Sequence, residues 1–155
     1  MTYKISGLDP SPFAHLMGRS DAELASQGAV RMIADSDFGF PCRVTLEDAR
    51  RGAKLLLVNH CSHEGDNPYR ASHAIFVSED ARQPAIYEDR VPPVFERRIL
   101  SLRAFDIDGM MVDAALAQPG DADAAIRKLL SDGSVDHIDA HNATRGCFAA
   151  RVERA

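Results

Sequence analysis

Two cysteines and a histidine have neighbours that could support nucleophilic chemistry. Cys42 stands beside Arg43, and Cys147 follows Gly146 shortly after His141. A nearby cation lowers the pKa of a thiol, and an imidazole can accept its proton, as in cysteine-based acyl or thiol chemistry. We therefore name Cys42, His141 and Cys147 as candidate catalytic residues. The alternative is structural, because unpaired cysteine is commonly a small buried side chain.

Arginines in or beside the expected strands form a second candidate group. Arg103 interrupts an otherwise apolar strand, and Arg151 lies on the last strand. A lone buried charge is costly, and a planar guanidinium binds carboxylate or phosphate through two hydrogen bonds. This predicts a pocket for an anionic small molecule, with ligand-binding residues Arg43, Tyr69, Arg70, Arg103, Asn142 and Arg151. The alternative is pairing with internal acids near the expected hairpin, such as Asp106, Asp108 or Asp113.

The segment from His60 to Asp66 holds the densest run of possible metal ligands, among them Cys61 and His63. Imidazole, thiolate and carboxylate together suit Zn²⁺. A structural zinc needs four ligands, however, and the usual paired spacing is missing. We therefore assign no metal ligand. Whether His60, Cys61 and His63 bind a metal or belong to a solvated polar loop stays open.

His137, Asp139 and His141 alternate along one expected strand and so share one of its faces. A carboxylate between two imidazoles could fix their tautomers, as it does beside catalytic or metal-bound histidines. Ordinary alternation gives a simpler interpretation, in which Ile138 and Ala140 pack on the core and the three polar side chains face water. We favour the simpler interpretation for His137.

Familiar catalytic motifs are missing from the chain. It has no GxGxxG before a helix, no GxxxxGK[ST], no HExxH and no GxSxG. Dinucleotide, P-loop, zincin and α/β-hydrolase interpretations therefore lack support. The sequence identifies no cofactor and leaves open whether the protein is an enzyme.

The elements that must position these residues are mostly strands. Apolar alternation and turn signals predict strands over residues 2–8, 30–34, 53–60, 73–77, 135–141 and 148–152. A hairpin over 100–107 and 110–117 turns at Asp108-Gly109 as type I′, pairing Phe105 with Val112 and Ile107 with Met110. Helices are predicted after the capping box at Ser20, after Pro93, and over residues 121–131.

Composition sets the limits of the fold class. The 155 residues are 45% hydrophobic, enough for one core, and the net charge is −5. We expect a single α+β domain over residues 1–155, with a mostly antiparallel or mixed sheet and two to three short helices. Acidity, three unpaired cysteines and the lack of an apolar leader or span predict a cytoplasmic protein that binds neither nucleic acid nor membrane.

Four segments in order carry a resemblance to a known family. They are Phe40-Pro41-Cys42-Arg43, residues 67–72, residues 101–106, and residues 141–151 with Gly146-Cys147-Phe148. Together they resemble a bacterial family catalogued as domain of unknown function 1203, over essentially the whole chain. The resemblance implies a single cytosolic bacterial domain and names no activity. Asn67 and His73 depart from the family pattern, which weakens any role for them.

Two classes of function follow from these residues. In the first, the protein is a small-molecule-binding protein or enzyme with a pocket of cysteine, histidine and arginine for an anionic ligand. In the second, it is a non-catalytic binding or assembly module whose cysteines and arginines are structural, and exposed sheet edges could form a homodimer.

Overall fold

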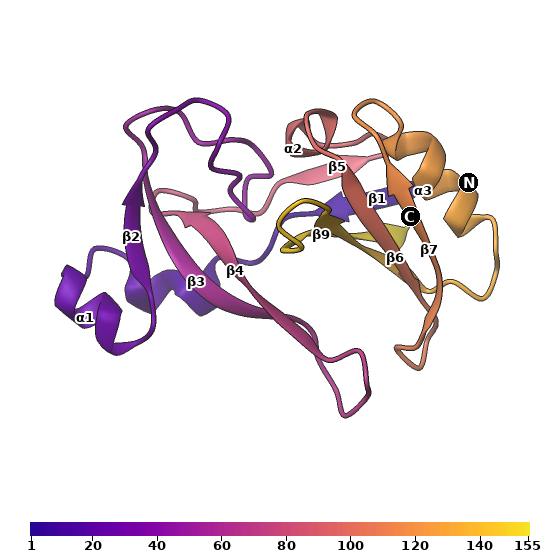
Figure 1. Ribbon diagram of the computed structural model, residues 1–155, viewed down its shortest axis with the longest axis horizontal. Helices are drawn as coiled ribbons and strands as arrows, with labels where there is room; N and C mark the ends of the chain where they lie inside the picture. Colours follow the sequence, from indigo (N-terminus) through magenta and orange to yellow (C-terminus); the bar gives the residue numbers. More distant parts are fainter.

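Two antiparallel β-sheets dominate the computed structural model, which describes all of residues 1–155 (Figure 1). The larger sheet has the strand order β5-β1-β9-β8-β6-β7, and the smaller has the order β2-β3-β4. The strands are β1 (Tyr3–Ser6), β2 (Val30–Ile33), β3 (Lys54–His63), β4 (Ala71–Ser78), β5 (Ile86–Glu88), β6 (Leu100–Phe105), β7 (Met111–Ala117), β8 (His137–Asn142) and β9 (Phe148–Arg154). The predicted α+β class with antiparallel strands is confirmed.

Three α-helices and one 3₁₀-helix complete the fold: η1 (Ser11–Leu16), α1 (Asp21–Ser26), α2 (Pro93–Glu96) and α3 (Ala122–Leu130). The capping box of α1 forms as predicted, since the Ser20 hydroxyl accepts from the Glu23 amide and the Glu23 carboxylate accepts from the Ser20 amide. The helix η1 and the strand β5 were not predicted from the sequence, because both are too short to show a clear period. No helix combines the length and apolarity that crossing a bilayer requires.

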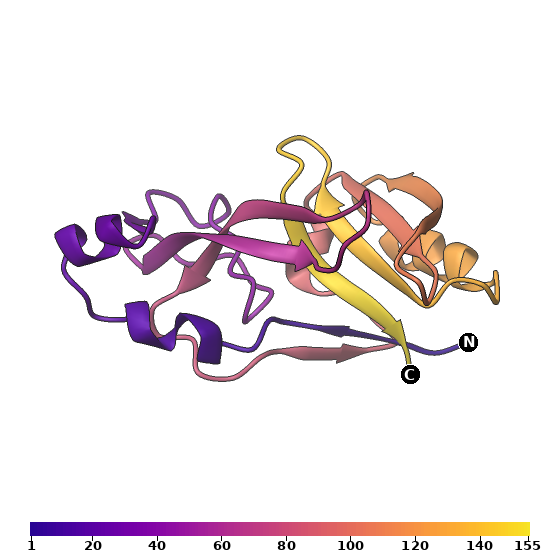
Figure 2. The ribbon, with the colours of Figure 1, turned by 90° about the horizontal axis from the view of Figure 1, so that it is seen from below.

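The larger sheet has one apolar face and one polar face. Alternate residues of β6, β8 and β9, among them Leu102, Ile138 and Val152, pack with Ile126 and Leu130 of α3 in the larger hydrophobic core. The residues between them point to the other face, where the β3–β4 hairpin approaches β9 (Figure 2). A second, smaller core lies beneath the smaller sheet. The contact between the two sheets therefore combines polar side chains with the buried rings of Phe105 and Phe148.

The β6–β7 hairpin turns differently from the prediction. The Asp106 carboxylate accepts hydrogen bonds from two main-chain amides of the turn, which widens it beyond two residues. A register shift follows at the end of β6, so Phe105 lies opposite Met111 rather than Val112. Ile107 is 81% exposed and has no apolar partner across the turn. The predicted apolar pairs at this turn are wrong.

Strand β3 is longer than predicted and contains a β-bulge. It runs to His63 instead of ending at His60, and its register against β4 shifts between Cys61 and His63. Residues three apart on a regular strand point to opposite faces, but a bulge changes this parity. His60 and His63 therefore both contact the larger sheet, through Phe148 and Phe105 respectively.

Candidate functional site

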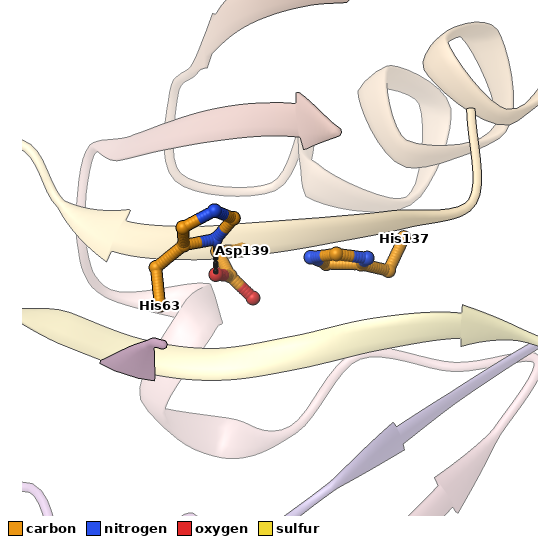
Figure 3. Close-up of side chains that lie close together, drawn as sticks. All are labelled: His63, His137 and Asp139. Carbon is orange, nitrogen blue, oxygen red and sulfur yellow. Dashed lines mark ion pairs between the residues drawn. The ribbon is translucent and has the colours of Figure 1, made fainter. Parts of the chain in front are cut away.

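His63 reaches the polar face of the larger sheet at the end of β3. Its Nε2 lies 2.9 Å from the carbonyl oxygen of Gly109 in the β6–β7 turn. A carbonyl only accepts, so Nε2 carries the proton and Nδ1 of the neutral ring keeps a lone pair. That Nδ1 lies 3.8 Å from Oδ2 of Asp139 (Figure 3).

His137, the first residue of β8, is held in a similar way. Its Nδ1 lies 2.9 Å from a carboxylate oxygen of Asp136, so Nδ1 carries the proton and Nε2 is the free acceptor. Nε2 is buried and has no hydrogen-bond partner. The ring stacks on Phe105, whose ring also stacks on His63. Phe105 thus orients both imidazoles.

Asp139 supplies the third group of this cluster and is only 1% exposed. Arg151 on the neighbouring β9 binds it with both arms, Nε to Oδ1 at 2.8 Å and Nη2 to Oδ2 at 3.1 Å. The same Nη2 donates to the main-chain oxygen of Ser62 at 3.0 Å, which ties β9 to β3. The sequence left open the alternative that the arginines pair with internal acids such as Asp106, Asp108 or Asp113. Arg151 does pair with an internal acid, but that acid is Asp139.

The interpretation favoured for His137, in which its side chain faces water, is wrong, and the other polar side chains on this face of β8 are covered as well. Asp139 and His141 are both buried, and the side chain of His137 is 12% exposed. The cause is the β3–β4 hairpin, which covers this face of the larger sheet and could not be placed from strand alternation. Ile138 and Ala140 do pack on the core, as expected.

Three acceptor atoms therefore converge at one point. The ligand atoms of His63, His137 and Asp139 all lie within 4.8 Å of one another. Figure 3 shows the Asp139 carboxylate between the two rings. From the sequence, His63 belongs to the run of possible metal ligands, and His137 and Asp139 belong to a separate group on β8. The bulge in β3 and the covering hairpin, which bring them together, have no clear sequence signal.

The cluster borders a cleft of about 600 Å³ between the end of β3, the β6–β7 turn and β8. Its charged lining is acidic, with Glu64, Asp66, Asp106 and Asp108 against the single cation of Arg151. A second hollow of about 540 Å³, beside η1 and β3, is half apolar. The two hollows share four lining residues, Leu8, His60, Cys61 and Glu64. They are therefore neighbouring parts of the cleft region.

Comparison with known protein families gives one match. A family model described as "Protein of unknown function (DUF1203)" matches residues 39–154. The chain belongs to the DUF1203 family. The resemblance inferred from the sequence is confirmed, and the matched range contains His63, His137 and Asp139. Neither the curated proteins nor the solved structures give a match.

In this DUF1203 protein, Cys42 lies in the smaller core and is 1% exposed. Its sulfur accepts a hydrogen bond from the Ser78 amide at 3.3 Å. Burial raises the pKa of the Cys42 thiol, but hydrogen bonds from Ser78 and Thr45 outweigh burial, and the net shift is downward. The surroundings are those of a packed structural thiol, with no opening to the cleft.

Cys147 is half-buried and lies against Arg43 rather than against the predicted base. Arg43 Nη2 donates to the Cys147 sulfur at 3.1 Å, and Asn142 Nδ2 approaches the same sulfur at 3.5 Å. The Nδ1 of His141 donates instead to the Gly146 carbonyl at 2.9 Å. No hydrogen bond joins His141 to either candidate sulfur. The structure thus brings the Cys147 sulfur together with the side chains of Arg43 and Asn142, and neither Cys42 nor His141 forms a side-chain hydrogen bond to that sulfur.

The remaining predicted ligand-binding residues do not share one pocket. Arg70 is exposed, and Tyr69 packs edge-on against Phe105. Arg103 has no carboxylate partner, its nearest polar contact being Ser101 Oγ at 3.5 Å. Of the six arginine, tyrosine and asparagine positions predicted, Arg151 alone lines the cleft.

Proposed function

We propose that this DUF1203 protein is a small-molecule-binding protein or enzyme whose ligand occupies the cleft between the two sheets. One observation carries the proposal. Three buried side-chain nitrogen or oxygen atoms lack a hydrogen-bond partner, and two of them, Ser62 Oγ and His137 Nε2, belong to residues that line this cleft. Buried polar groups are nearly always paired, so unpaired ones in a cleft indicate bonds that a ligand completes.

The charges of the cleft favour a ligand with a positive group. The two hollows contain five acids in total, counting Asp9, and Arg151 is already neutralised by Asp139. Burial lowers the pKa of His60, so that ring adds no charge at neutral pH. Phe13, Leu16 and Val58 give the second hollow apolar walls. An organic cation with an apolar body fits both parts, whereas the anion predicted from the arginines would meet repulsion here.

A matched set of probes tests this proposal. Benzylamine, benzyl alcohol and benzoate share one ring and differ in charge, and their binding to metal-free full-length protein is measured by calorimetry with chelator present. We expect benzylamine to bind most tightly and benzoate not to bind. Asn59→Trp should weaken benzylamine at least tenfold, because exposed Asn59 lines the second hollow. Arg70→Met, outside the cleft, is the control. Equal binding of all three probes, or of none, would refute the proposal.

A second candidate ligand is a small anion, which would bind where β4 meets β8, away from the acidic cleft. The buried Nδ1 of His73 has no partner, and its ring lies 5.0 Å from that of His141. Arg103 lies near both rings and lowers the pKa of each, after burial. A small anion such as phosphate would pair with Arg103 and accept from His73. Phosphate should raise the melting temperature of the wild-type protein and of Arg70→Met, but not that of Arg103→Met. If phosphate does not stabilise the wild-type protein, this site is excluded.

A further inference from the structure

We propose that His63, His137 and Asp139 bind a divalent transition-metal ion at the inner wall of the cleft, with Zn²⁺ the best fit. The three ligand atoms belong to strands β3 and β8 and lie within 4.8 Å of one another. The inference goes beyond the organic ligand of the cleft, and His137 Nε2 is the one group that both proposals use, leaving Ser62 Oγ to the organic ligand when the ion is bound.

The hydrogen bonds around the two rings leave only acceptors at the centre. Gly109 O fixes the proton of His63 on Nε2, and the Asp136 carboxylate fixes the proton of His137 on Nδ1. The two remaining ring nitrogens and the Asp139 carboxylate all present lone pairs to the same space. Three buried acceptors facing one another repel, and a cation placed between them removes that repulsion.

A shared proton does not account for the arrangement. His63 Nδ1 and Asp139 Oδ2 are 3.8 Å apart, beyond the range of a hydrogen bond. His137 Nε2 has no partner at all. Both oxygens of Asp139 are already bound by Arg151.

The donor set selects the class of metal. Two imidazole nitrogens and one carboxylate oxygen suit Zn²⁺ and other first-row transition ions, whereas Mg²⁺ and Ca²⁺ prefer oxygen ligands alone. Ligand bonds of about 2.0–2.2 Å in tetrahedral geometry place two ligands of one ion about 3.3–3.6 Å apart. The widest separation, up to 4.8 Å, therefore has to close by roughly 1.2–1.5 Å when an ion binds, through side-chain rotation.

The outer contacts are those that support metal ligands. Each ring donates its second nitrogen to a fixed acceptor, the usual arrangement around a metal-bound histidine. Arg151 holds both oxygens of Asp139, and each oxygen keeps a second lone pair for an ion. Phe105, stacked on both rings, fixes their planes. Arg151 and Asp136 are thus positioning residues.

Three protein ligands leave at least one coordination position open. His63 and His137 line the acidic cleft, so the open position faces its solvent and any bound molecule. Metal sites with three protein ligands and one open position are the catalytic type, in which the ion polarises a bound water or substrate oxygen. The acidic residues along the cleft favour the entry of cations.

The test uses Co²⁺ and Zn²⁺ alone, added to chelator-treated full-length protein with no organic ligand. We expect one Co²⁺ per chain with visible absorption bands, displaced by one equivalent of Zn²⁺. His137→Gln and Asp139→Asn should each weaken binding at least about 100-fold, because each removes a ligand. His60→Gln, a half-buried histidine of the same cleft, is the matched control and should change affinity less than threefold.

Asp136→Asn provides a second test in case the variants that lack a metal ligand do not fold. Its side chain is 44% exposed, so the fold should be unaffected, but its weaker bond to His137 should lower metal affinity about tenfold. No binding by the wild-type protein would overturn the proposal. So would a loss of affinity in His60→Gln with no loss in His137→Gln, which would place the metal on the run from His60 to Cys61. Neither result bears on benzylamine binding, which is measured with chelator present.

Discussion

Arg43 is buried with a charge that no carboxylate neutralises. Its three donor groups go to the main-chain oxygens of Phe148 and Pro41, at 2.8 and 2.6 Å, and to the Cys147 sulfur. Burial lowers the pKa of its guanidinium, and the neighbouring sulfur opposes this. The Arg43 amide donates to the Phe76 carbonyl of β4 at 2.9 Å, and its side chain donates to Phe148 of β9, so this residue links the two sheets.

We expect Arg43→Ala to be among the most destabilising substitutions in the chain. It would remove the donors to the main-chain oxygens of Pro41 and Phe148 and open a cavity, at a cost of about 3 kcal/mol in the free energy of unfolding. For a domain of this size that corresponds to a melting temperature lower by roughly 6–12 °C. Arg70→Ala, at an exposed arginine, should change it by under about 2 °C. Thermal and urea unfolding of both variants check this, and equal stabilities would contradict the structural role of Arg43.

His141 is held neutral by its surroundings. Burial is the main cause that lowers its pKa from 6.5 to about 4, and the nearby Arg103 and His73 add to the effect. The Gly146 carbonyl and Asp139 oppose it. The ring is therefore uncharged at neutral pH in the folded protein.

This pKa predicts a loss of stability in mild acid. Between pH 6.5 and pH 4 the unfolded chain binds more protons at this histidine than the folded protein does, so the free energy of unfolding falls as the pH is lowered. The full loss from His141 is about 3 kcal/mol by pH 4. His141→Asn, which keeps a donor for Gly146, should flatten this slope, whereas His15→Asn at the exposed surface should not. Urea unfolding from pH 7 to pH 4 measures both, and an unchanged slope in His141→Asn would refute the assignment.

The β6–β7 turn does more than reverse the chain, because its Gly109 carbonyl orients His63. Gly109 has a φ of 77°, and a Cβ there would lie 3.0 Å from Asn67 Nδ2 and 3.3 Å from His63 Nε2. The turn therefore needs glycine for its backbone and for the space that the ring occupies. Gly120, with a φ of 92°, has nothing within 4 Å of its Cβ position.

We expect Gly109→Ala and Gly120→Ala to separate these two requirements. Both force a side chain into the left-handed region, at about 1–2 kcal/mol each. Only Gly109→Ala displaces His63, so it alone should also weaken Co²⁺ binding, by about tenfold. Urea unfolding and the Co²⁺ titration give the two readouts. Equal Co²⁺ affinities in the two variants would show that the turn does not position His63.

At the scale of the whole molecule, β7 leaves one edge of the larger sheet open. Val112 and Leu116 on this strand are 43% and 68% exposed. An edge strand with unpaired main-chain groups and exposed apolar side chains is a template for pairing with another chain. This is the feature that favours the assembly module, with a second copy of this chain adding its own β7.

We therefore predict a concentration-dependent dimer that Leu116→Lys disrupts. A charge on the edge strand disfavours strand addition, and the fold should tolerate it because the side chain faces solvent. Ile86→Lys is the control, because Ile86 is also an exposed apolar residue but lies on β5 at the opposite edge of the sheet. This substitution should leave association unchanged. Sedimentation equilibrium measures both, and a monomeric wild-type protein at high micromolar concentration would contradict the prediction.

Local energetics explain which parts of the fold could be predicted from the sequence. The buried stripe of α3, the capping box of α1 and the strands near residues 54–63, 71–78 and 137–154 depend on side chains close in sequence. The β6–β7 turn was mispredicted because the Asp106 carboxylate competes for the turn amides, which outweighs the usual preference of Asp-Gly.

The amino-acid sequence by itself determined the α+β class, most of its strands and helices, and the residue types available for chemistry. The tertiary structure alone decided which of these residues meet. His63 joins His137 and Asp139 across more than seventy positions because a bulge reverses the parity of β3 and its hairpin covers β8. Such long-range contacts depend on packing of the whole chain, whereas alternation along a strand fixes only which residues share a face.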